Sequence, residues 1–269
     1  MPQQAPNQTA ETVEDASSLW VIVRCNQNLI GFDADCVGNM IALPKVTRVP
    51  GTDDFMSGTI TVRGSIIPLI DLRVYTGQKS ADEEVDEFDK LMDQRLLDHQ
   101  NWIQELKASV EEERTFKLTS DPHQCAFGKW YNSYQSNDRF VAAVLAKFDQ
   151  PHKTIHGIAT TVEELVAKEQ LDQAHQLIDQ TAAGELQLMV GLFDEVKKAA
   201  REASRRRIAM VLELEERTLA LDIDEVVAVE SISKFQPAPP QQTDRLGIEK
   251  IGRRDKDDEL VLLMEDVAF

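Results

Sequence analysis

The chain has 269 residues, of which 42% are hydrophobic, and this length allows one or two domains with a real core. Its formal net charge of -18 argues against nucleic acid and against an anionic membrane surface as partners. Three widely separated cysteines do not make a disulfide framework, which indicates a reducing cytoplasm. No apolar run is long enough to cross a membrane, and the N-terminus lacks the charged and apolar regions of a signal peptide.

The N-terminal part of the chain combines a polar tail with a β pattern. Residues 1–17 are rich in Gln, Thr, Ala and Pro, which predicts a disordered tail. Residues 18–80 have β character. Apolar runs at 19–25 and 29–34, separated by turn residues at 26–28, predict a hairpin.

Two further short strands are predicted at 58–63 and 65–72, on either side of Gly64. A glycine between two such runs is the usual mark of a bend or a bulge. Pro68 lies within the second run and cannot donate a hydrogen bond to a neighbouring strand. We therefore expect an edge strand or a barrel corner at this position.

From about residue 81 the apolar positions follow the period of a helix. They are separated by three or four residues and comprise Phe88, Met92, Leu96, His99, Ile103, Leu106 and Val110. His99 lies within this apolar stripe and should point into the interior of a helical bundle. A buried imidazole without a partner is costly, so His99 needs either a metal or a hydrogen bond to a neighbour.

Two later helix starts are marked by proline. The sequence Ser-Asp-Pro at 120–122 would place Cys125 in the first turn of a helix or just after it. The sequence Asp-Gln-Pro at 149–151 would begin another helix. His152 and His156 would then lie one turn apart on one face of that helix.

The final helix is predicted at about 171–205, and the β pattern returns after it. Arginines near its end suit the negative pole of the helix and indicate a solvated helix end rather than a binding patch: Arg201, Arg205, Arg206 and Arg207. Strands are expected at 208–214, 218–223, 248–252 and 260–264. The order β, α, β predicts an α+β protein, in which a helical domain at 81–204 interrupts a β domain made of 18–80 and 205–269.

Three histidines and one cysteine in the helical segment offer a complete set of tetrahedral zinc donors: His99, Cys125, His152 and His156. A lone cysteine is usually a small core residue, and two histidines four apart are weak evidence, but the combination favours a metal. The positive pole of a helix N-terminus would favour a Cys125 thiolate and a neutral His152, the forms that zinc requires. His123 could compete as a ligand but should be exposed, and His175 should be a packed or surface histidine.

A catalytic zinc site is the main chemical alternative. The relevant protease motif has glutamate directly after its first histidine, where this chain has Lys153. Four protein ligands would also leave no open position for water. A di-iron bundle needs Glu-x-x-His pairs, and no phosphate-binding glycine-rich loop, nucleophile elbow or dinucleotide fingerprint occurs in the chain. We therefore predict that the protein is not an enzyme.

The helical segment resembles the CZB domain, the chemoreceptor zinc-binding domain. The resemblance rests on His99-Gln-Asn-Trp102, Cys125-Ala-Phe-Gly-Lys-Trp130 and His152-Lys-Thr-Ile-His156. It implies a helical bundle whose zinc site, held by these three histidines and Cys125, acts as a signalling input. It also implies that the zinc-bound cysteine is a target of oxidants such as hypochlorous acid.

The two β segments resemble CheW, the coupling protein of bacterial chemotaxis arrays. The resemblance rests on the stretch 58–72, Gly-Thr-Ile-Thr-Val-Arg-Gly-Ser-Ile-Ile-Pro-Leu-Ile-Asp-Leu, and on Leu221-Asp-Ile-Asp224-Glu-Val226. It implies a pair of small β-barrels that bridges chemoreceptors and a histidine kinase. Arg63 occupies the position of an arginine implicated in those contacts, although the sequence alone would favour a plain surface arginine.

Together the two resemblances imply a cytoplasmic signalling adaptor that is associated with chemoreceptor arrays. Zinc, and oxidation of Cys125, would be its inputs, and the helical bundle could mediate a homodimer. Two alternatives stay open at this point: a constitutive scaffold in which zinc only stabilises the bundle, or a zinc-dependent hydrolase.

Overall fold

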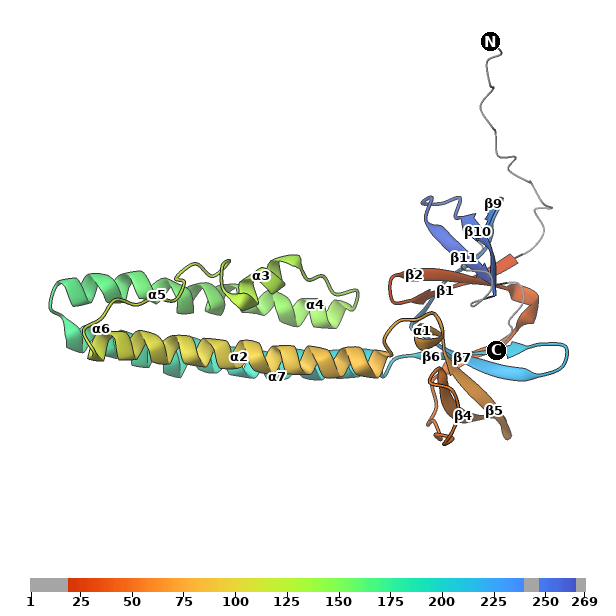
Figure 1. Cartoon of the computed structure of the whole chain (residues 1–269), viewed down its shortest axis with the longest axis horizontal. Helices are drawn as coiled ribbons and strands as arrows, with labels where there is room; N and C mark the ends of the chain where they lie inside the picture. Colours follow the sequence, from red (N-terminus) through yellow and green to blue (C-terminus); the bar gives the residue numbers. More distant parts are fainter. Residues whose placement is uncertain (1–18, 240–246, 265–269) are drawn as a thin grey trace, which may run out of the picture. The chain divides into compact units, whose positions relative to one another are not determined.

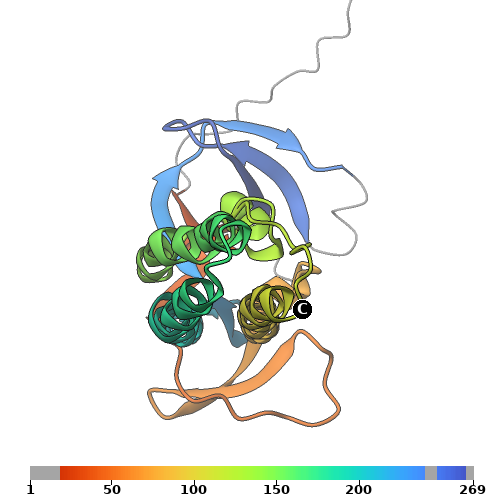
Figure 2. The same ribbon diagram turned by 90° about the vertical axis from the view of Figure 1, so that its left-hand side faces the viewer.

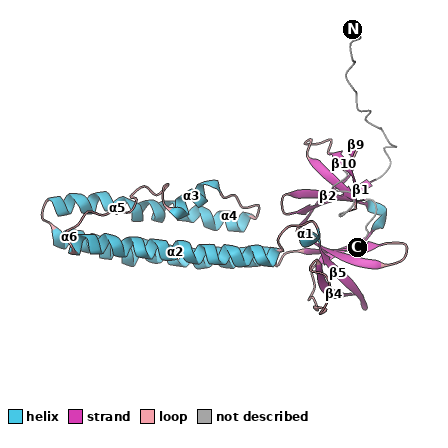
Figure 3. Cartoon of the chain, viewed as in Figure 1, coloured by secondary structure: helices cyan, strands magenta, loops and turns pink. Residues whose placement is uncertain are grey.

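The computed structural model describes residues 19–239 and 247–264, so the predicted tail at 1–17 lies outside the described residues. The chain divides into two compact units (Figure 1). The β unit comprises Met1–Ala81 and Arg205–Phe269, and the helical unit comprises Asp82–Ser204. Figure 3 shows that the strands are confined to the first unit and the long helices to the second.

The larger sheet of the β unit has the order β8-β1-β2-β11-β10-β9. Its strands are β1 (Leu19–Cys25), β2 (Asn28–Asp33), β8 (Glu225–Ser231), β9 (Lys234–Pro237), β10 (Ile248–Arg253) and β11 (Leu260–Met264). β1 and β2 form the predicted antiparallel hairpin, and β11 joins β2 in parallel. Strands β8 and β9 are not predicted from the sequence.

The second sheet has the order β3-β6-β7-β5-β4. Its strands are β3 (Val37–Ala42), β4 (Met56–Val62), β5 (Ser65–Asp71), β6 (Ile208–Glu213) and β7 (Thr218–Ile223). Both sheets combine strands from before and after the helical unit, so neither β segment could complete a sheet alone. Within the described residues, the first and last strands of each order are not paired, so neither sheet closes by hydrogen bonds into a barrel.

The alternation of side chains along the strands builds a core on each face of the sheets. Val21 and Val23 of β1 pack with Met210 and Leu221 of the second sheet in the main core. The opposite faces carry two smaller cores, one around Trp20 and the other with members that include Ile60, Leu69 and Val211. Because successive residues of a strand point to opposite faces, strands that are buried on both sides read as continuous apolar runs. The predicted α+β class, with a helical insert in a β domain, is confirmed.

Pro68 does not lie on an edge strand, which corrects one expectation from the sequence. Strand β5 lies between β4 and β7, but its parallel pairing with β7 begins only at Leu69. The missing N–H of Pro68 therefore falls outside that ladder. Gly64 does lie at a bend, because it belongs to the turn that joins β4 to β5.

Six α-helices build most of the helical unit, and Figure 2 views the long ones end-on. They are α2 (Ala81–Glu111), α3 (Ala126–Ser133), α4 (Arg139–Leu145), α5 (Asp149–Ala167) and α6 (Leu171–Thr181), followed by a π-helical turn (Ala182–Leu186) and a further α-helix, α7 (Gln187–Ser204). The predicted final helix is thus one rod that contains a π turn. The predicted stripe of α2 faces a single core that includes Met92, Leu106 and Phe193.

Two expectations about helix ends need correction. Helix α3 begins at Ala126 rather than at Pro122, so Cys125 is the residue that caps it. Of the arginines near the end of α7, Arg201, Arg205 and Arg206 are exposed, as expected for a solvated helix end, and Arg207 is the exception. Arg201 pairs with Asp89 of α2, and Arg207 belongs to the β unit, where it pairs with the buried Asp222.

Candidate metal centre

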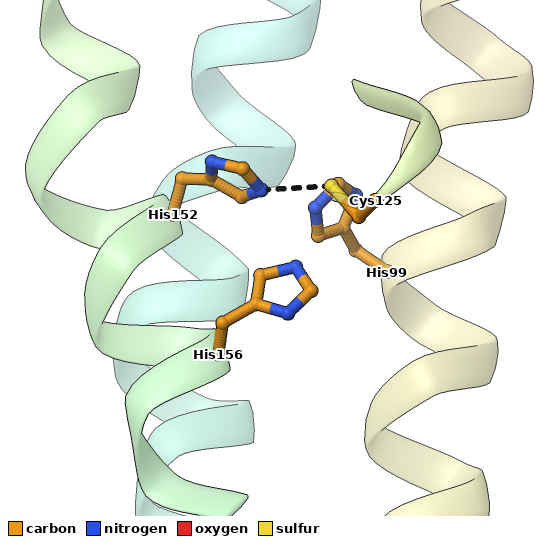
Figure 4. Close-up of side chains that lie close together, drawn as sticks. All are labelled: His99, Cys125, His152 and His156. Atoms are coloured by element: carbon orange, nitrogen blue, oxygen red, sulfur yellow. Dashed lines mark hydrogen bonds between the residues drawn. The ribbon is translucent and has the colours of Figure 1, made fainter. Parts of the chain in front are cut away.

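The structure brings together the four residues that the sequence singled out as zinc donors. His99 comes from α2, Cys125 caps α3, and His152 and His156 lie one turn apart on α5 (Figure 4). One donor atom from each residue lies within 4.8 Å of the donor atoms of the other three. All three histidines are buried, and Cys125 is half-buried.

Backbone carbonyls orient two of the imidazole rings. His99 Nδ1 lies 2.6 Å from the carbonyl oxygen of Arg95, and His156 Nδ1 lies 3.2 Å from that of Thr119. A carbonyl oxygen can only accept a hydrogen bond, so both Nδ1 atoms carry the proton. The lone pair of each neutral ring is then on Nε2.

These Nε2 atoms are the strongest sign of a missing partner in the site. The Nε2 atoms of His99 and His156 are buried and have no hydrogen-bond partner among the described residues. A buried polar atom without a partner costs about 1–3 kcal/mol, so a folded protein seldom keeps two of them side by side. A cation at the centre of the cluster would satisfy both lone pairs.

The thiol of Cys125 completes the donor set. Its Sγ lies 3.2 Å from His152 Nε2 and accepts a hydrogen bond of 3.1 Å from the backbone N–H of Gly128. Two ligands of one tetrahedral zinc would be roughly 3.5 Å apart, given ordinary Zn–S and Zn–N bond lengths. Three imidazole nitrogens and one sulfur are a donor set that zinc prefers, so the residues present fit this metal.

Gly128 is required by a close approach of the backbone. A Cβ atom at this position would lie 1.8 Å from the carbonyl oxygen of Pro122. Only glycine therefore allows the loop before α3 to fold back over the first turn of the helix and present Cys125 to the histidines. This explains why the motif has glycine three residues after the cysteine, which the sequence alone did not reveal.

Burial decides the protonation of the four side chains in the absence of metal. It lowers the pKa of His99, that of His152 to about 3 and that of His156 to about 4, so the rings are neutral at pH 7. Burial also raises the pKa of the Cys125 thiol, although the N–H groups of Gly128 and Phe127 act in the opposite direction. The expected effect of the helix N-terminus on Cys125 is thus present but outweighed by burial.

Trp102 contacts His156 and shares a hydrogen-bond acceptor with it. Its buried indole N–H donates a hydrogen bond of 2.8 Å to the carbonyl oxygen of Thr119, the same oxygen that receives the N–H of His156. The ring of Trp102 also lies against the ring of His156, with 4.9 Å between their centres. The sequence pointed to Trp102 only as part of a motif, and nothing in it indicated Thr119.

Aromatic side chains of the helical core border the site. Phe127 meets the rings of His99 and His152 edge to face, and Phe193 of α7 packs against Phe127 and His99. Such a wall lowers the local polarity and strengthens electrostatic interactions within the site. The arrangement can hold a cation tightly, but four protein donors leave it no open position for a reacting water.

The two remaining histidines lie outside the cluster. His123 is exposed, and its ring contacts Asn132. His175 is half-buried in α6. Neither is among the four residues that converge in the described part of the chain.

Arg63, the residue expected to contact partners, lies in the β unit at the tip of the hairpin between β4 and β5. Val62 pairs with Ser65, so Arg63 and Gly64 form a two-residue turn, with φ angles of 49° and 89°. Such turns favour Asn or Gly in the first position, because other residues are strained at positive φ. Arg63 is exposed and makes no ion pair within the described residues.

Two comparisons with protein families agree with these observations. Residues 99–162 match the family model of the chemoreceptor zinc-binding domain, CZB, and this range contains all four converging residues. Residues 19–92 match the family model of the CheW-like domain. One segment of the chain is thus similar to the CheW-like domain and another to the CZB domain. The CheW-like match covers β1 to β5 and continues into the first part of α2.

Among solved structures, the chain is similar to the crystal structure of the scaffolding protein TtCheW from Thermoanaerobacter tengcongensis. The TM-score is 0.42 and the sequence identity 14%, over 93% of this chain and 89% of that chain. A search of curated protein sequences gave no significant match. Among the described helices of the two domains, none is both long and apolar enough to span a membrane.

Proposed function

We propose that this protein is a non-enzymatic chemotaxis adaptor that responds to zinc. Its CheW-like domain, formed by residues 18–80 and 205–269, would link chemoreceptors to a histidine kinase. Its CZB domain, residues 81–204, would bind zinc and act as the input. The two family matches support the adaptor role, and the convergence of three imidazoles and a thiol supports the zinc site.

The observation that carries the zinc assignment is the pair of buried Nε2 atoms without hydrogen-bond partners. His99, Cys125, His152 and His156 would hold the ion through three nitrogens and a thiolate. Bound zinc would supply the positive charge that keeps the Cys125 thiol deprotonated at neutral pH, against the effect of burial.

Metal analysis of the purified protein tests this assignment. We expect about one zinc per chain in the wild type and far less in Cys125→Ala and His152→Ala. His123→Ala is the matched control, because His123 is close in sequence to Cys125 but lies outside the cluster. Equal zinc content in all four proteins would reject the site.

The input would act through a difference in partner affinity between the zinc-bound and zinc-free forms. Without such a difference zinc could not shift the output, however tightly it binds. Hypochlorous acid would be a second input at the same residue. It would convert the Cys125 thiolate into a sulfenic acid and chloride, so that sulfur loses two electrons and leaves the donor set.

A purely structural zinc is the second candidate function. The closed set of four donors and the burial of the three histidines are typical of sites that only stabilise a domain. The two candidates differ in one measurement, the affinity for a receptor signalling tip with and without a zinc chelator. An unchanged affinity while the helical unit stays folded would favour the structural role.

The CheW-like domain would contact its partners through the hairpin that carries Arg63. Its strained backbone, and a guanidinium that makes no ion pair among the described residues, suggest that this arginine serves through its side chain rather than in the turn. We place the protein in the cytoplasm, at chemoreceptor arrays, and we also propose a homodimer through the helical bundle. Co-sedimentation with receptor and kinase, and the mass of the isolated protein in solution, test these two points.

A further inference from the structure

The two chain segments that flank the helical unit are both held by the same part of the β unit. Strand β5 leads into the short helix α1 (Leu72–Tyr75) on the way to the helical unit, and Arg207 precedes β6 on the way back. Arg73 of α1 pairs with Asp224, while Arg207 pairs with Asp222. The two acceptors are therefore two residues apart, at the end of β7.

Both ion pairs are short and largely removed from solvent. Arg73 Nε lies 2.8 Å and 3.0 Å from the two carboxylate oxygens of Asp224, and the two side chains are 14% and 19% exposed. The Arg207 guanidinium lies 2.9 Å from Asp222, whose side chain is 4% exposed. Pairs this deeply buried hold their geometry more strictly than surface pairs, because an unpaired charge there would be costly.

Further contacts fix each segment to the strands. Asp71, the neighbour of Asp222 in the parallel pairing of β5 and β7, accepts hydrogen bonds from the backbone N–H groups of Arg73 and Val74 at the start of α1. Burial raises the pKa of Asp71, and the Val74 N–H and the charge of Arg207 oppose that rise. The carbonyl oxygen of Arg207 also accepts the N–H of Leu43.

The chain segments before α2 and after α7 are both short, and both are held to the β strands. Gln78, just before α2, donates a backbone hydrogen bond to the Arg73 carbonyl, and its side chain contacts the carbonyl of Cys25 at the end of β1. Arg207 follows the last residue of α7, Ser204, by three positions. Neither segment is a free linker in the structure.

We infer that Asp222 and Asp224 form a clamp that holds the segments entering and leaving the helical unit. A change in the position of the two ends of that unit relative to each other would then be transmitted to β5 and β7. The inference deepens the proposed function, on which its signalling role rests. The clamp itself lies within the β unit, so its existence can be tested without any partner.

Amide hydrogen exchange of the full-length, zinc-loaded protein tests the clamp directly. We expect Asp224→Asn to raise exchange in α1 and at Gln78 by about tenfold or more, and Asp222→Asn to do the same around Arg207 and Leu43. Glu230→Gln is the matched control. It weakens another buried arginine pair of the β unit, with Arg254, and should leave both segments within about threefold of the wild type.

Unchanged exchange in both segments of Asp222→Asn and Asp224→Asn would overturn the inference. If an asparagine variant does not fold, Arg73→Lys and Arg207→Lys provide the same test, because lysine keeps the charge but loses the fork of donors. Arg73→Lys should raise exchange only in the segment before α2, and Arg207→Lys only in the segment after α7. Zinc content should stay at the wild-type value, since no ligand is touched.

The signalling role of the clamp needs a second measurement. The affinity for a receptor signalling tip is compared with and without chelator, in the wild type and in Asp222→Asn/Asp224→Asn. A response to zinc that is present in the wild type and lost in the double variant supports transmission through the clamp, and an equal response in both rejects it. If the wild type itself does not respond, the proposed sensing function fails, and hydrogen exchange alone decides whether the clamp exists.

Discussion

Trp102 and His156 donate their ring N–H groups to one and the same acceptor, the carbonyl oxygen of Thr119. The three groups come from α2, from α5 and from the loop between α2 and α3. Because the Nδ1 proton of His156 is fixed on this carbonyl, its Nε2 lone pair is directed at Cys125 and the other histidines. Trp102, which is not a candidate ligand, thus helps to hold the carbonyl that fixes the tautomer and direction of His156.

Trp102→Phe should weaken zinc binding by about 10- to 100-fold, the usual cost of losing a partner behind a metal ligand. Phenylalanine keeps an aromatic ring against His156 but removes the N–H that fixes Thr119. Competition with a chromophoric zinc chelator measures the change. Trp130→Phe is the control, since Trp130 contacts Phe127 and Tyr134 rather than a candidate ligand, and it should bind zinc as the wild type does. Equal affinities of the two variants would contradict the role of Trp102.

Gly128→Ala should destabilise the helical unit by about 2–4 kcal/mol and lower its zinc content. The added Cβ would collide with the Pro122 carbonyl, so the loop that presents Cys125 has to move. Gly191→Ala is a matched control in α7, where a Cβ meets no atom within 4 Å and should stabilise the helix by about 0.5–1 kcal/mol. Urea unfolding, followed by circular dichroism, compares the two. A Gly128→Ala protein as stable as the wild type would show that the close approach is not needed.

The zinc-free protein should lose stability as the pH falls below about 6.5. Histidine has an ordinary pKa of 6.5, but burial lowers the pKa of His152 to about 3 and that of His156 to about 4. Between these values the unfolded chain binds more protons than the folded chain, so the stabilisation is complete above pH 6.5 and decreases as the pH drops. The other ionisable groups that act on these two rings are His99, His123, Lys153 and Asp121.

Thermal unfolding of chelator-treated protein between about pH 7.5 and 5 measures this effect, because most carboxylates stay charged in that range. His175→Gln should show the same pH dependence as the wild type, since His175 lies outside the cluster. A melting temperature that stays constant or rises toward pH 5 would contradict the burial of neutral imidazoles.

Arg63→Asn should separate partner binding from stability. Asparagine tolerates positive φ better than arginine, so the hairpin should gain roughly 0.5 kcal/mol while affinity for a receptor tip or kinase falls about tenfold. Calorimetric titration against either partner gives the affinity, and thermal unfolding gives the stability. Arg48→Asn, which removes an exposed charge from the preceding loop, should change neither by much. Unaltered binding by Arg63→Asn would remove Arg63 from the contact surface.

Periodicity in the sequence was sufficient to predict several elements closely. The first strand was predicted at 19–25 and is found at Leu19–Cys25, and the helix marked by Asp149 begins at that residue. Strand β8 was missed, since its residues, Glu-Val-Val-Ala-Val-Glu-Ser, are exposed or half-buried and do not alternate cleanly between apolar and polar. The edge-strand expectation for Pro68 failed because strand order depends on pairings between distant segments, which local sequence does not contain.

The candidate site shows the same division between sequence and structure. Residue types and helical spacing were enough to predict the four candidate donors, because side-chain chemistry and local periodicity can be read from the sequence. The free nitrogen of His99 and of His156 could not be predicted in this way, since the Arg95 and Thr119 acceptors are backbone carbonyls, and every residue has one. Which carbonyl accepts the proton of each imidazole depends on the backbone atoms that folding brings beside the ring. Packing decides this, not residue type.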